Sequence, residues 1–236
     1  MAEVSTRRNN ADMQRLLTSP RLAVYHAEAG DFDRAIDLYH WNRNLGAALF
    51  ADISLVEVAF RNAIDTALQV TFGSPHWYWD NQTRDYSRKL EKKSKEKLKK
   101  VAHYANAQPI TTMSPGKVVS ELMLGFWVEL LEQPYERSLW LPDWTRAQGI
   151  AHSFSGLRRL QRRPVYRWAS LMQQTRNRVA HHEPIFAGVR RKGSQTRVPI
   201  ADVYKEIVAL AEAVHPAIAQ QLSKDSRFDA VLKVRP

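Results

Sequence analysis

The sequence predicts an all-α protein, a helical bundle with additional short helices. Three observations lead to this fold class. Apolar residues recur every three or four positions over long stretches, as they do on one face of an α-helix. No segment shows the alternating pattern of a convincing strand. Glycine and proline fall at the ends of the helical stretches, and a bundle of helices around one core fits all three observations.

The first 73 residues predict one short helix and one long helix. Ser19 and Pro20 supply an N-cap followed by an N1 proline, and Gly30 suits the end of a short helix. Asp31 or Asp33 marks the start of the next helix, which is expected to end by Gly73. The apolar positions of the long helix are separated by steps of three and four: Leu45, Leu49, Ile53, Val56, Phe60, Ile64 and Ala67.

The middle of the chain predicts a turn, a basic helix and a central helix. Residues 73–80, GSPHWYWD, form a turn whose aromatic side chains are expected to plug the edge of the core. Residues 84–100 carry nine basic and three acidic side chains and predict a basic helix, for which a solvated face is the usual explanation. Residues 117–133 are apolar on nearly every side, which predicts a central helix that ends before Pro134.

The last third of the chain predicts three more helices. FSGLRRLQRR is expected to form a helix that is cut at Pro164, where a second helix starts. Glu183 precedes Pro184 and is therefore disfavoured in the α region, so this second helix should end near His182. Residues 200–214 repeat the apolar spacing of three and four up to Pro216.

At 236 residues the chain is expected to form one large domain. The predicted all-α domain spans residues 19–222, between an N-terminal extension at 1–18 and a C-terminal tail at 223–236. A hydrophobic content of 44% with 7 Trp supports a sizeable core. The N-terminus lacks the apolar region of a secretory signal, and no apolar run approaches the roughly 18 residues of a membrane span. We therefore expect a soluble, cytoplasmic protein without membrane contact.

The charge balance indicates a polyanionic partner. Thirty-five Lys and Arg against 24 Asp and Glu give a net charge of +11, which favours nucleic acid, with an anionic membrane surface as the weaker alternative. The absence of cysteine excludes disulfides, a thiolate nucleophile and Cys-ligated zinc. No Gly-rich phosphate loop is present, and three adjacent residues such as His181 to Glu183 do not converge on one ion. We expect neither a cofactor nor a metal.

The stretch TRNRVAHHEPIF, residues 175–186, gathers polar groups that suit catalysis. Asn177 and His181 are four residues apart on one helix face, and the long side chain of Arg176, about 140° away, can reach round the helix end. The negative end of the helix dipole favours an imidazolium there. Such a set can cleave RNA without metal. One imidazole takes the proton of the ribose 2′-OH, another protonates the leaving 5′ oxygen, a guanidinium stabilises phosphoryl charge and an amide orients the groups.

This chemistry needs two imidazoles. His181 and His182 are adjacent, but their side chains diverge on a helix, whereas a symmetric dimer brings two equivalent His181 residues together. The structural alternative is that both histidines cap the helix end and that Arg176 and Arg178 are solvated. Spacing alone favours this alternative, because arginine and histidine occur at similar spacings elsewhere. Only at residue 176 is Arg-Asn followed by three residues and then His.

Three segments, in order along the chain, resemble the Abi-like family of bacterial abortive-infection proteins. They are AIDLYHWNRNLGAALFADISLVEVAFRNAID, VVSELMLGFWVELL and RNRVAHHEPIF, and the last resembles the RN-x3-H motif of the HEPN superfamily of ribonucleases. The likeness covers roughly residues 22–186. It implies a HEPN-type all-α bundle, a homodimer that composes the active site, and a metal-independent endoribonuclease of an abortive-infection or toxin-antitoxin system. It also implies a small RNA as an inhibitory partner.

Carried over to this sequence, the resemblance assigns Arg176 as the transition-state stabiliser, Asn177 as the orienting group and His181 as the acid and base. The supporting candidates are His182, Arg61 and Asn62. The first follows the double histidine of the family, and the other two lie in a family-like stretch. Helix-surface ion pairs of Arg61 with Glu57 and Asp65 also explain that stretch well.

Arginine-rich clusters on both sides of the motif predict phosphate contacts without sequence choice, and RNA affinity that falls with salt. The RNA-binding candidates are Arg158, Arg159, Arg162, Arg163, Arg190, Arg191 and Lys192. Trp127 and Trp168 are expected in the core, whereas Trp140 and Trp144 remain open as base-stacking residues. Two other functions compete with the ribonuclease: a non-catalytic RNA-binding or antitoxin-like module, and a structural interaction protein with a vestigial motif.

Overall fold

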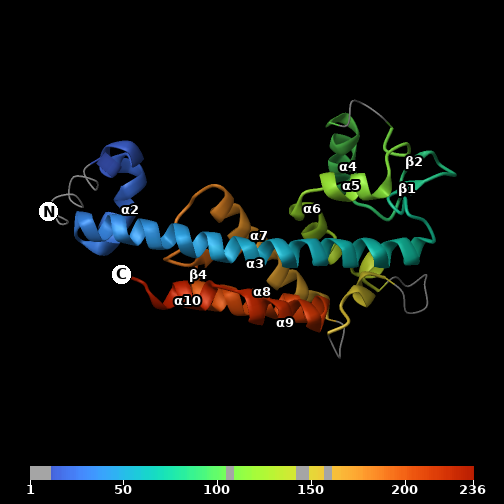
Figure 1. Ribbon diagram of the computed structural model, residues 1–236. Coiled ribbons are helices and arrows are strands. Elements are labelled where there is room, and N and C mark those ends of the chain that lie inside the picture. Colours follow the sequence, from blue (N-terminus) through green and yellow to red (C-terminus); the bar gives the residue numbers. More distant parts are fainter. Residues whose placement is uncertain (1–11, 105–108, 142–148, 157–160) are drawn as a thin grey trace.

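One long helix runs through the molecule, and the other helices pack around it (Figure 1). A computed structural model describes residues 12–104, 109–141, 149–156 and 161–236. Helix α3, Phe32–Phe72, has 41 residues and is therefore about 60 Å long. The Asp31 side chain accepts a hydrogen bond from the backbone N–H of Arg34 (3.0 Å) and caps its start. Gly73 ends it in the left-handed conformation, with a φ of 62°. The predicted start and end of this helix are confirmed.

Helix α2, Ser19–Ala29, packs on the N-terminal part of α3. Its end at Gly30, with a φ of 70°, is confirmed. Its N-cap is Thr18 rather than Ser19, and Thr18 makes no side-chain capping hydrogen bond. The ring of Tyr25 on α2 contacts the rings of Tyr39 on α3 and Phe186, which lies beyond the candidate motif helix. This aromatic cluster ties α2 to both elements.

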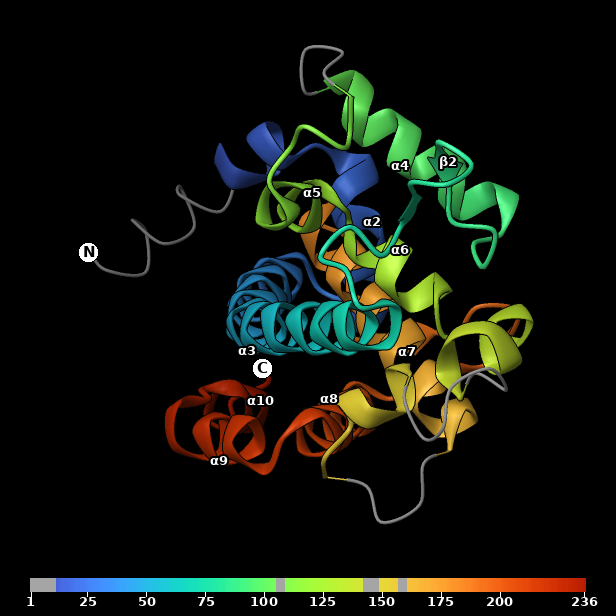
Figure 2. The same ribbon diagram turned by 90° about the vertical axis from the view of Figure 1, so that its right-hand side faces the viewer.

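The C-terminal helices form a layer along one side of α3 (Figure 2). They are α8 (Ile200–Val214), α9 (Pro216–Asp225) and α10 (Phe228–Lys233), and the predicted span of α8 is confirmed. Asp52 of α3 accepts a hydrogen bond from the Ser226 hydroxyl (2.5 Å), and the indole N–H of Trp41 donates to the carbonyl of Val231 (2.7 Å). The division into residues 1–18, 19–222 and 223–236 stays a prediction.

Two short antiparallel strand pairs correct the expectation of a chain without strands. Trp79–Asp80 (β1) pairs antiparallel with Asp85–Tyr86 (β2), and the two aromatic rings of this pair meet edge to face at 5.4 Å. Residues 84–91 are therefore not helical, and the basic helix α4 spans only Lys92–Tyr104. Lys97 of α4 pairs with the buried Glu129 at 2.6 Å, so part of the basic face is bound to the protein itself.

The prediction of one central helix over 117–133 is wrong, because the segment forms two helices and the second ends at Glu129, before the residues that lead to Pro134. They are α5, Pro115–Glu121, and α6, Leu124–Glu129. Met123 between them has an extended backbone and an 80% exposed side chain, whereas Leu122 and Leu124 are both buried. Residues two apart on one helix point to roughly opposite sides, so the break lets both leucines be buried. Three short turns follow: η1 (Gln133–Tyr135), η2 (Glu136–Trp140) and η3 (Ile150–Ser153).

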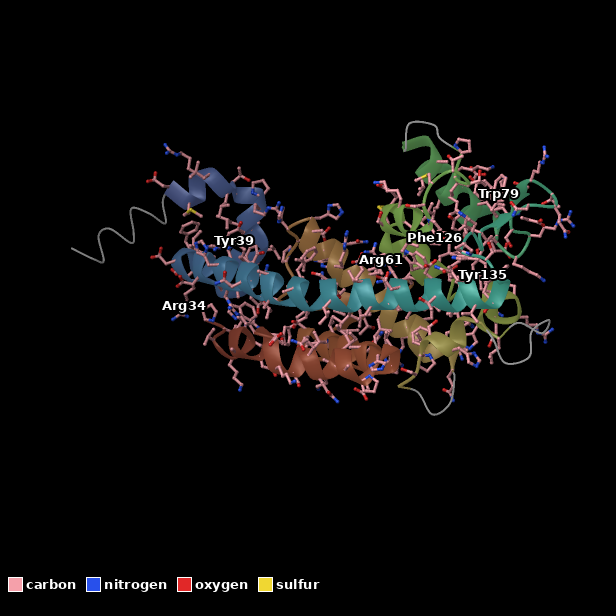
Figure 3. All side chains as sticks on the ribbon, turned by 45° about the vertical axis from the view of Figure 1, so that its right-hand side comes forward. Arg34, Tyr39, Arg61, Trp79, Phe126 and Tyr135 are labelled. Carbon is pink, nitrogen blue, oxygen red and sulfur yellow. The ribbon has the colours of Figure 1, made fainter. Side chains whose placement is uncertain are left out.

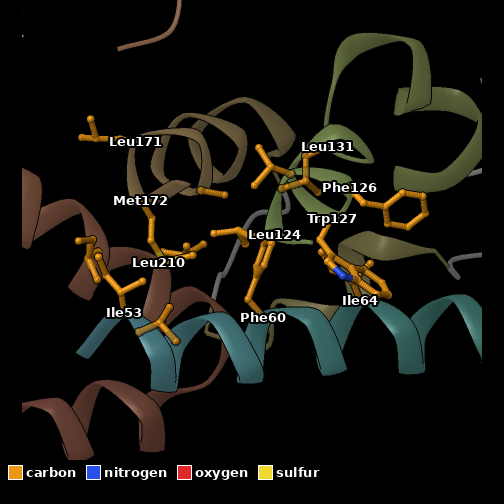
Figure 4. Packing of buried hydrophobic residues seen from close by; sticks show 14 of the residues in the cluster. Ile53, Phe60, Ile64, Leu124, Phe126, Trp127, Leu131, Leu171, Met172 and Leu210 are labelled. Carbon is orange, nitrogen blue, oxygen red and sulfur yellow. The ribbon is translucent and has the colours of Figure 1, made fainter. Parts of the chain in front are cut away.

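The core lies where α3, α6, α7 and α8 meet (Figure 4). Phe60 of α3, Trp127 of α6 and Met172 of α7 are fully buried within it. Trp77 and Tyr78 of the predicted aromatic turn are buried as well, which confirms their place in the core. Two tryptophans remained open as base-stacking residues. Trp140 is buried against Phe154, and Trp144 lies outside the described residues. Trp127 and Trp168 pack in or against the core as expected.

Helix α7, Arg162–Ala180, carries the candidate motif and packs on α3, α6 and α8. Pro164 lies in its first turn, where proline is tolerated, so this helix starts two residues earlier than expected. The preceding residues Phe154–Gly156 are not helical, and most of the rest of that predicted segment lies outside the described residues. After α7 the chain forms a small hairpin, with Val189–Arg190 (β3) paired to Arg197–Val198 (β4).

Candidate functional site

The helix that bears the motif ends sharply at the two histidines. Its last helical residue is Ala180, so both histidines follow the helix instead of lying in its last turn. His181 caps the helix, and its backbone N–H donates to the carbonyl of Asn177 (2.9 Å). His182 has a φ of 56°, a left-handed conformation that turns the chain out of the helix axis. Its carbonyl accepts a hydrogen bond from the Arg21 guanidinium (2.7 Å), which holds the turn to α2.

A buried asparagine on α3 anchors the segment that follows. The side-chain oxygen of Asn42, Oδ1, accepts hydrogen bonds from the backbone N–H groups of Ile185 (2.9 Å) and Phe186 (3.0 Å). Its amide donates to the hydroxyl of Tyr25 (3.1 Å). Asn42 is not among the residues that the sequence motifs predict for the site. The sequence could have indicated it, because Asn42 lies three residues before Leu45 on the buried face of the long helix. A buried amide without a hydrogen-bond partner costs folding free energy, so such an asparagine is expected to bind another segment.

Arg178 has a structural role at this helix end. Its guanidinium donates to the carbonyl of Pro184 (2.7 Å) and pairs with the carboxylate of Glu183 at 3.0 Å. Burial lowers the pKa of Arg178, although Glu183 acts against that shift. Since both of its terminal nitrogens serve the turn itself, Arg178 is not a free guanidinium for a substrate.

Arg176 is directed toward α3, where a glutamate joins it to Arg61. Glu57 lies 3.6 Å from the Arg176 Nε and 3.9 Å from an Arg61 Nη. Glu57 is only 12% exposed and Arg176 is 37% exposed, so solvent screens this cluster only in part. Arg61 also donates to the carbonyl of Leu122 (3.4 Å) and lies between α3 and the α5–α6 segment in Figure 3. One carboxylate thus links the predicted stabiliser to a predicted supporting residue.

The expected second ion pair of Arg61 does not form. Asp65 instead accepts hydrogen bonds from the Trp77 indole (2.8 Å) and the Gln69 amide (2.6 Å). Asn62 points to another side of α3, where it lines a cavity of about 650 Å³ together with His152 and His215. The structure therefore brings Arg61, but not its neighbour Asn62, to the motif.

Asn177 and His181 lie one turn apart on the outer side of α7. His181 is exposed and Asn177 is half-buried. Arg176 is about 140° away from His181 around the helix axis and engages Glu57. His182 is exposed as well, but it lies beyond the helix end in the left-handed turn. At the helix end itself a single chain presents the His181 imidazole and a guanidinium on a neighbouring side, whereas metal-free RNA cleavage requires two proton-transfer groups.

An open apolar surface lies beside this helix end. A cavity of about 900 Å³ between α2, α3 and the end of α7 is lined by Tyr25, Phe50, Val179 and His182, among others. Phe50, which lines this cavity, and Leu55 and Val58 further along α3 are 38%, 37% and 49% exposed. We call these three residues the α3 apolar face. Adjacent exposed apolar side chains of this kind are typical of protein contact surfaces.

The structure uses several predicted RNA contacts for its own ion pairs. Arg162 donates to the carbonyl of Leu131 (2.6 Å) and pairs with Glu136 at 3.3 Å. Arg191 makes two hydrogen bonds to the Glu206 carboxylate, and Lys192 pairs with Glu132 at 3.1 Å. Of the predicted RNA-binding residues that the structure describes, the other two, Arg163 and Arg190, are exposed. Arg158 and Arg159 lie outside the described residues.

The fold and the site define an all-α protein with an Arg-Asn-x3-His motif at an exposed helix end. The chain belongs to the family described as Abi-like protein (Abi_2), whose family model matches residues 12–187. That match spans α2 to the end of the motif helix and confirms the family resemblance. It supports an abortive-infection role in phage defence. No curated protein and no solved structure matches this chain. None of the helices in the described part combines the length and the apolar composition that crossing a bilayer requires.

Proposed function

We propose that this Abi-like protein is a cytoplasmic, homodimeric endoribonuclease of HEPN type that cleaves RNA without a metal, as an abortive-infection effector or as the toxin of a toxin-antitoxin system. The observation that supports this most is the exposed His181 at the end of α7, one turn from Asn177 and beside the Arg176–Glu57–Arg61 cluster. The net charge of +11 supports RNA as the substrate. A small RNA that occupies the same surface is the proposed inhibitory partner.

In the proposed reaction the ribose 2′ oxygen attacks the adjacent phosphorus while the 5′ oxygen leaves. One His181 imidazole takes the 2′-OH proton, and a second imidazole, as imidazolium, delivers a proton to the leaving 5′ oxygen. Arg176 stabilises the negative charge that builds on the phosphoryl oxygens, and Asn177 orients the reacting groups. The products are a 2′,3′-cyclic phosphate and a free 5′-hydroxyl.

A homodimer supplies the second imidazole. The α3 apolar face begins at Phe50, which lines the same cavity as His182, so a partner copy that covers this face would bring its own helix end close by. Two-fold symmetry makes the two His181 residues equivalent, which allows one to act as base and the other as acid. His182, in its left-handed turn, is then the residue that sets the direction of this helix end.

The second candidate function is a non-catalytic RNA-binding or antitoxin-like module. One observation favours it: Arg176 is already paired with Glu57 in the single chain, so it is not free to meet a phosphate there. In this alternative the basic surface binds RNA and the histidines only end the helix.

Cleavage of total bacterial RNA and tRNA in EDTA separates the two functions. The samples are the wild type, His181→Ala and, as a matched control, His152→Ala, which removes an exposed histidine on another side of α3. The ribonuclease predicts fragments with 2′,3′-cyclic phosphate ends from the wild type and His152→Ala. Loss of an acid-base group lowers the rate of His181→Ala by about 10²–10⁴-fold with RNA binding retained. Intact RNA in all three samples, together with salt-sensitive binding, would support the RNA-binding module.

A further inference from the structure

The first turns of α7 face the β3–β4 hairpin across a cavity of about 530 Å³. We call it the α7–hairpin cavity, and its lining is Gln161, Arg163, Pro164, Tyr166, Arg167, Ser170, Leu171, Arg191 and Lys192. Four of these side chains are cationic and none carries a carboxylate. The nearest acids, Glu206 and Glu132, pair with Arg191 and Lys192. Glu206 also lies 3.8 Å from Arg167.

The cavity keeps a positive excess despite these pairs. Glu206 balances one charge of the two arginines beside it, and the Arg167 side chain is 59% exposed. Lys192 shares Glu132 with Lys93. Arg163 is exposed at the cavity rim, and no ion pair of it is found among the described residues. This excess favours a phosphate ligand.

The apolar part of the lining indicates which kind of polyanion fits. Tyr166 offers an aromatic ring beside the cations, with Pro164 and Leu171 as apolar neighbours. A basic groove with an aromatic platform is the combination that holds single-stranded nucleic acid, because phosphates meet the cations while a base stacks on the ring. The volume lies within the range of pockets that enclose a nucleotide-sized ligand.

The cavity and the candidate catalytic histidine lie on the same side of α7. About five helical turns separate Arg163 from His181. The Cα atoms of the two residues therefore lie on one side of the α7 axis and about 27 Å apart along it. The hairpin continues the positive charge between them. Arg190 and Arg197 are near enough to Arg178, in the last turn of α7, for their charges to act on it. Basic residues thus follow the helix from the cavity to the motif.

We propose that the α7–hairpin cavity binds a nucleotide of single-stranded RNA at a distance from the bond that is cleaved. The inference rests on the proposed function and adds the substrate class to it: a single strand long enough to reach from the cavity to His181. At 3.4 Å per nucleotide of a stacked strand, the span is about eight nucleotides, and fewer of an extended strand.

Binding of labelled single-stranded RNAs of 4, 8, 12 and 16 nucleotides tests this site. Fluorescence anisotropy is measured in the His181→Ala background, so that the RNA survives. The test variant adds Arg163→Glu and Arg167→Glu, and the matched control adds Lys224→Glu and Lys233→Glu, two exposed lysines of α9 and α10 with the same charge change. We expect affinity to rise at least tenfold between 4 and 12 nucleotides in the parent and in the control.

In the test variant this gain should disappear, so that the 12- and 16-mers bind within about twofold of the 4-mer. The slope of log affinity against log salt for the 16-mer should fall by about 1.4, at about 0.7 for each lost single-strand phosphate contact. An equal loss of affinity for every RNA length, or the same loss in the control, would overturn the proposed site. A 16-base-pair duplex that competes as well as the single strand would overturn the assignment to single-stranded RNA.

Cleavage measured on otherwise wild-type protein keeps the two proposals apart. Length-dependent binding without cleavage supports the cavity and contradicts the ribonuclease. Equal cleavage of 4- and 16-mers supports the ribonuclease and contradicts the cavity. A chain that binds none of these RNAs contradicts both.

Discussion

Glu57 is the residue through which the predicted supporting and catalytic arginines are connected. It is largely buried and lies within 4 Å of both guanidinium groups. In the sequence Glu57 stands out only as an ion-pair partner of Arg61, because the two are four residues apart on one helix. Its contact with Arg176 joins positions far apart in the chain, so no local spacing reveals it. We regard Glu57 as a positioning residue for Arg176.

Glu57→Gln should lower kcat for RNA cleavage about tenfold with little change in KM, because Arg176 loses the carboxylate that fixes its position beside His181. The free energy of unfolding should change by no more than about 1 kcal/mol, since solvent partly screens these pairs. Cleavage kinetics and thermal unfolding measure the two effects.

The matched control is Glu96→Gln, which removes the carboxylate of an exposed ion pair with Lys99 on α4. It should leave kcat unchanged. A rise in kcat for Glu57→Gln would mean that Glu57 holds Arg176 away from the substrate, and an unchanged kcat with a lower melting temperature would leave it a structural role only.

At the scale of elements, helix limits were predictable wherever caps and periodicity are local. The ends of α3 and α8 follow from the Asp31 cap, Gly73 and the proline after α8. The break at Met123 was not predictable, because the residues around it are apolar on every side and show no cap. It follows from how Leu122 and Leu124 pack against the other elements. The same holds for β1 and β2, where the Trp79–Tyr86 contact decides against a longer α4.

The contact between α3 and the C-terminal layer should make stability depend on pH. Burial raises the pKa of Asp52, although its hydrogen bonds with Ser226 and Tyr204 act in the opposite direction. A raised pKa in the folded state means that the carboxyl stabilises the fold fully below its unfolded pKa of about 3.8. That contribution is lost as the pH rises through the folded pKa.

Asp52→Asn removes this titration while it keeps a side-chain oxygen that accepts a hydrogen bond. Its free energy of unfolding, relative to the wild type, should therefore increase as the pH rises from about 4 to about 6. Urea unfolding across that range measures it. A difference between the two proteins that stays constant with pH would show that Asp52 has no raised pKa in the folded protein.

At the scale of the whole molecule, the α3 apolar face bears on the proposed homodimer. Val58→Asp should shift the protein from dimer to monomer in sedimentation, because it places a carboxylate at the centre of the face that a partner copy would cover. RNA cleavage should fall at least tenfold, while the helical circular dichroism remains.

Val70→Asp is the matched control for this change. Val70 is exposed on the same helix but lines the cavity that holds Asn62, away from the motif. It should leave both the dimer and the cleavage intact. A monomeric wild type that cleaves RNA would contradict the composite site, and a dimer that survives Val58→Asp would place the interface on another face.

The sequence by itself determined the all-α class, the long helix, the helix that carries the motif and the family. These depend on apolar periodicity, capping residues and short motifs, which act over a few neighbouring positions. Only the tertiary structure decided that Arg176 meets Glu57, that Asn42 anchors the segment after the motif, and that Asn62 faces elsewhere. It also decided that much of the predicted RNA-binding charge is held in ion pairs. The physical reason is that side chains distant in sequence meet only when whole helices pack together. Which acidic group a basic side chain pairs with is therefore decided by that packing.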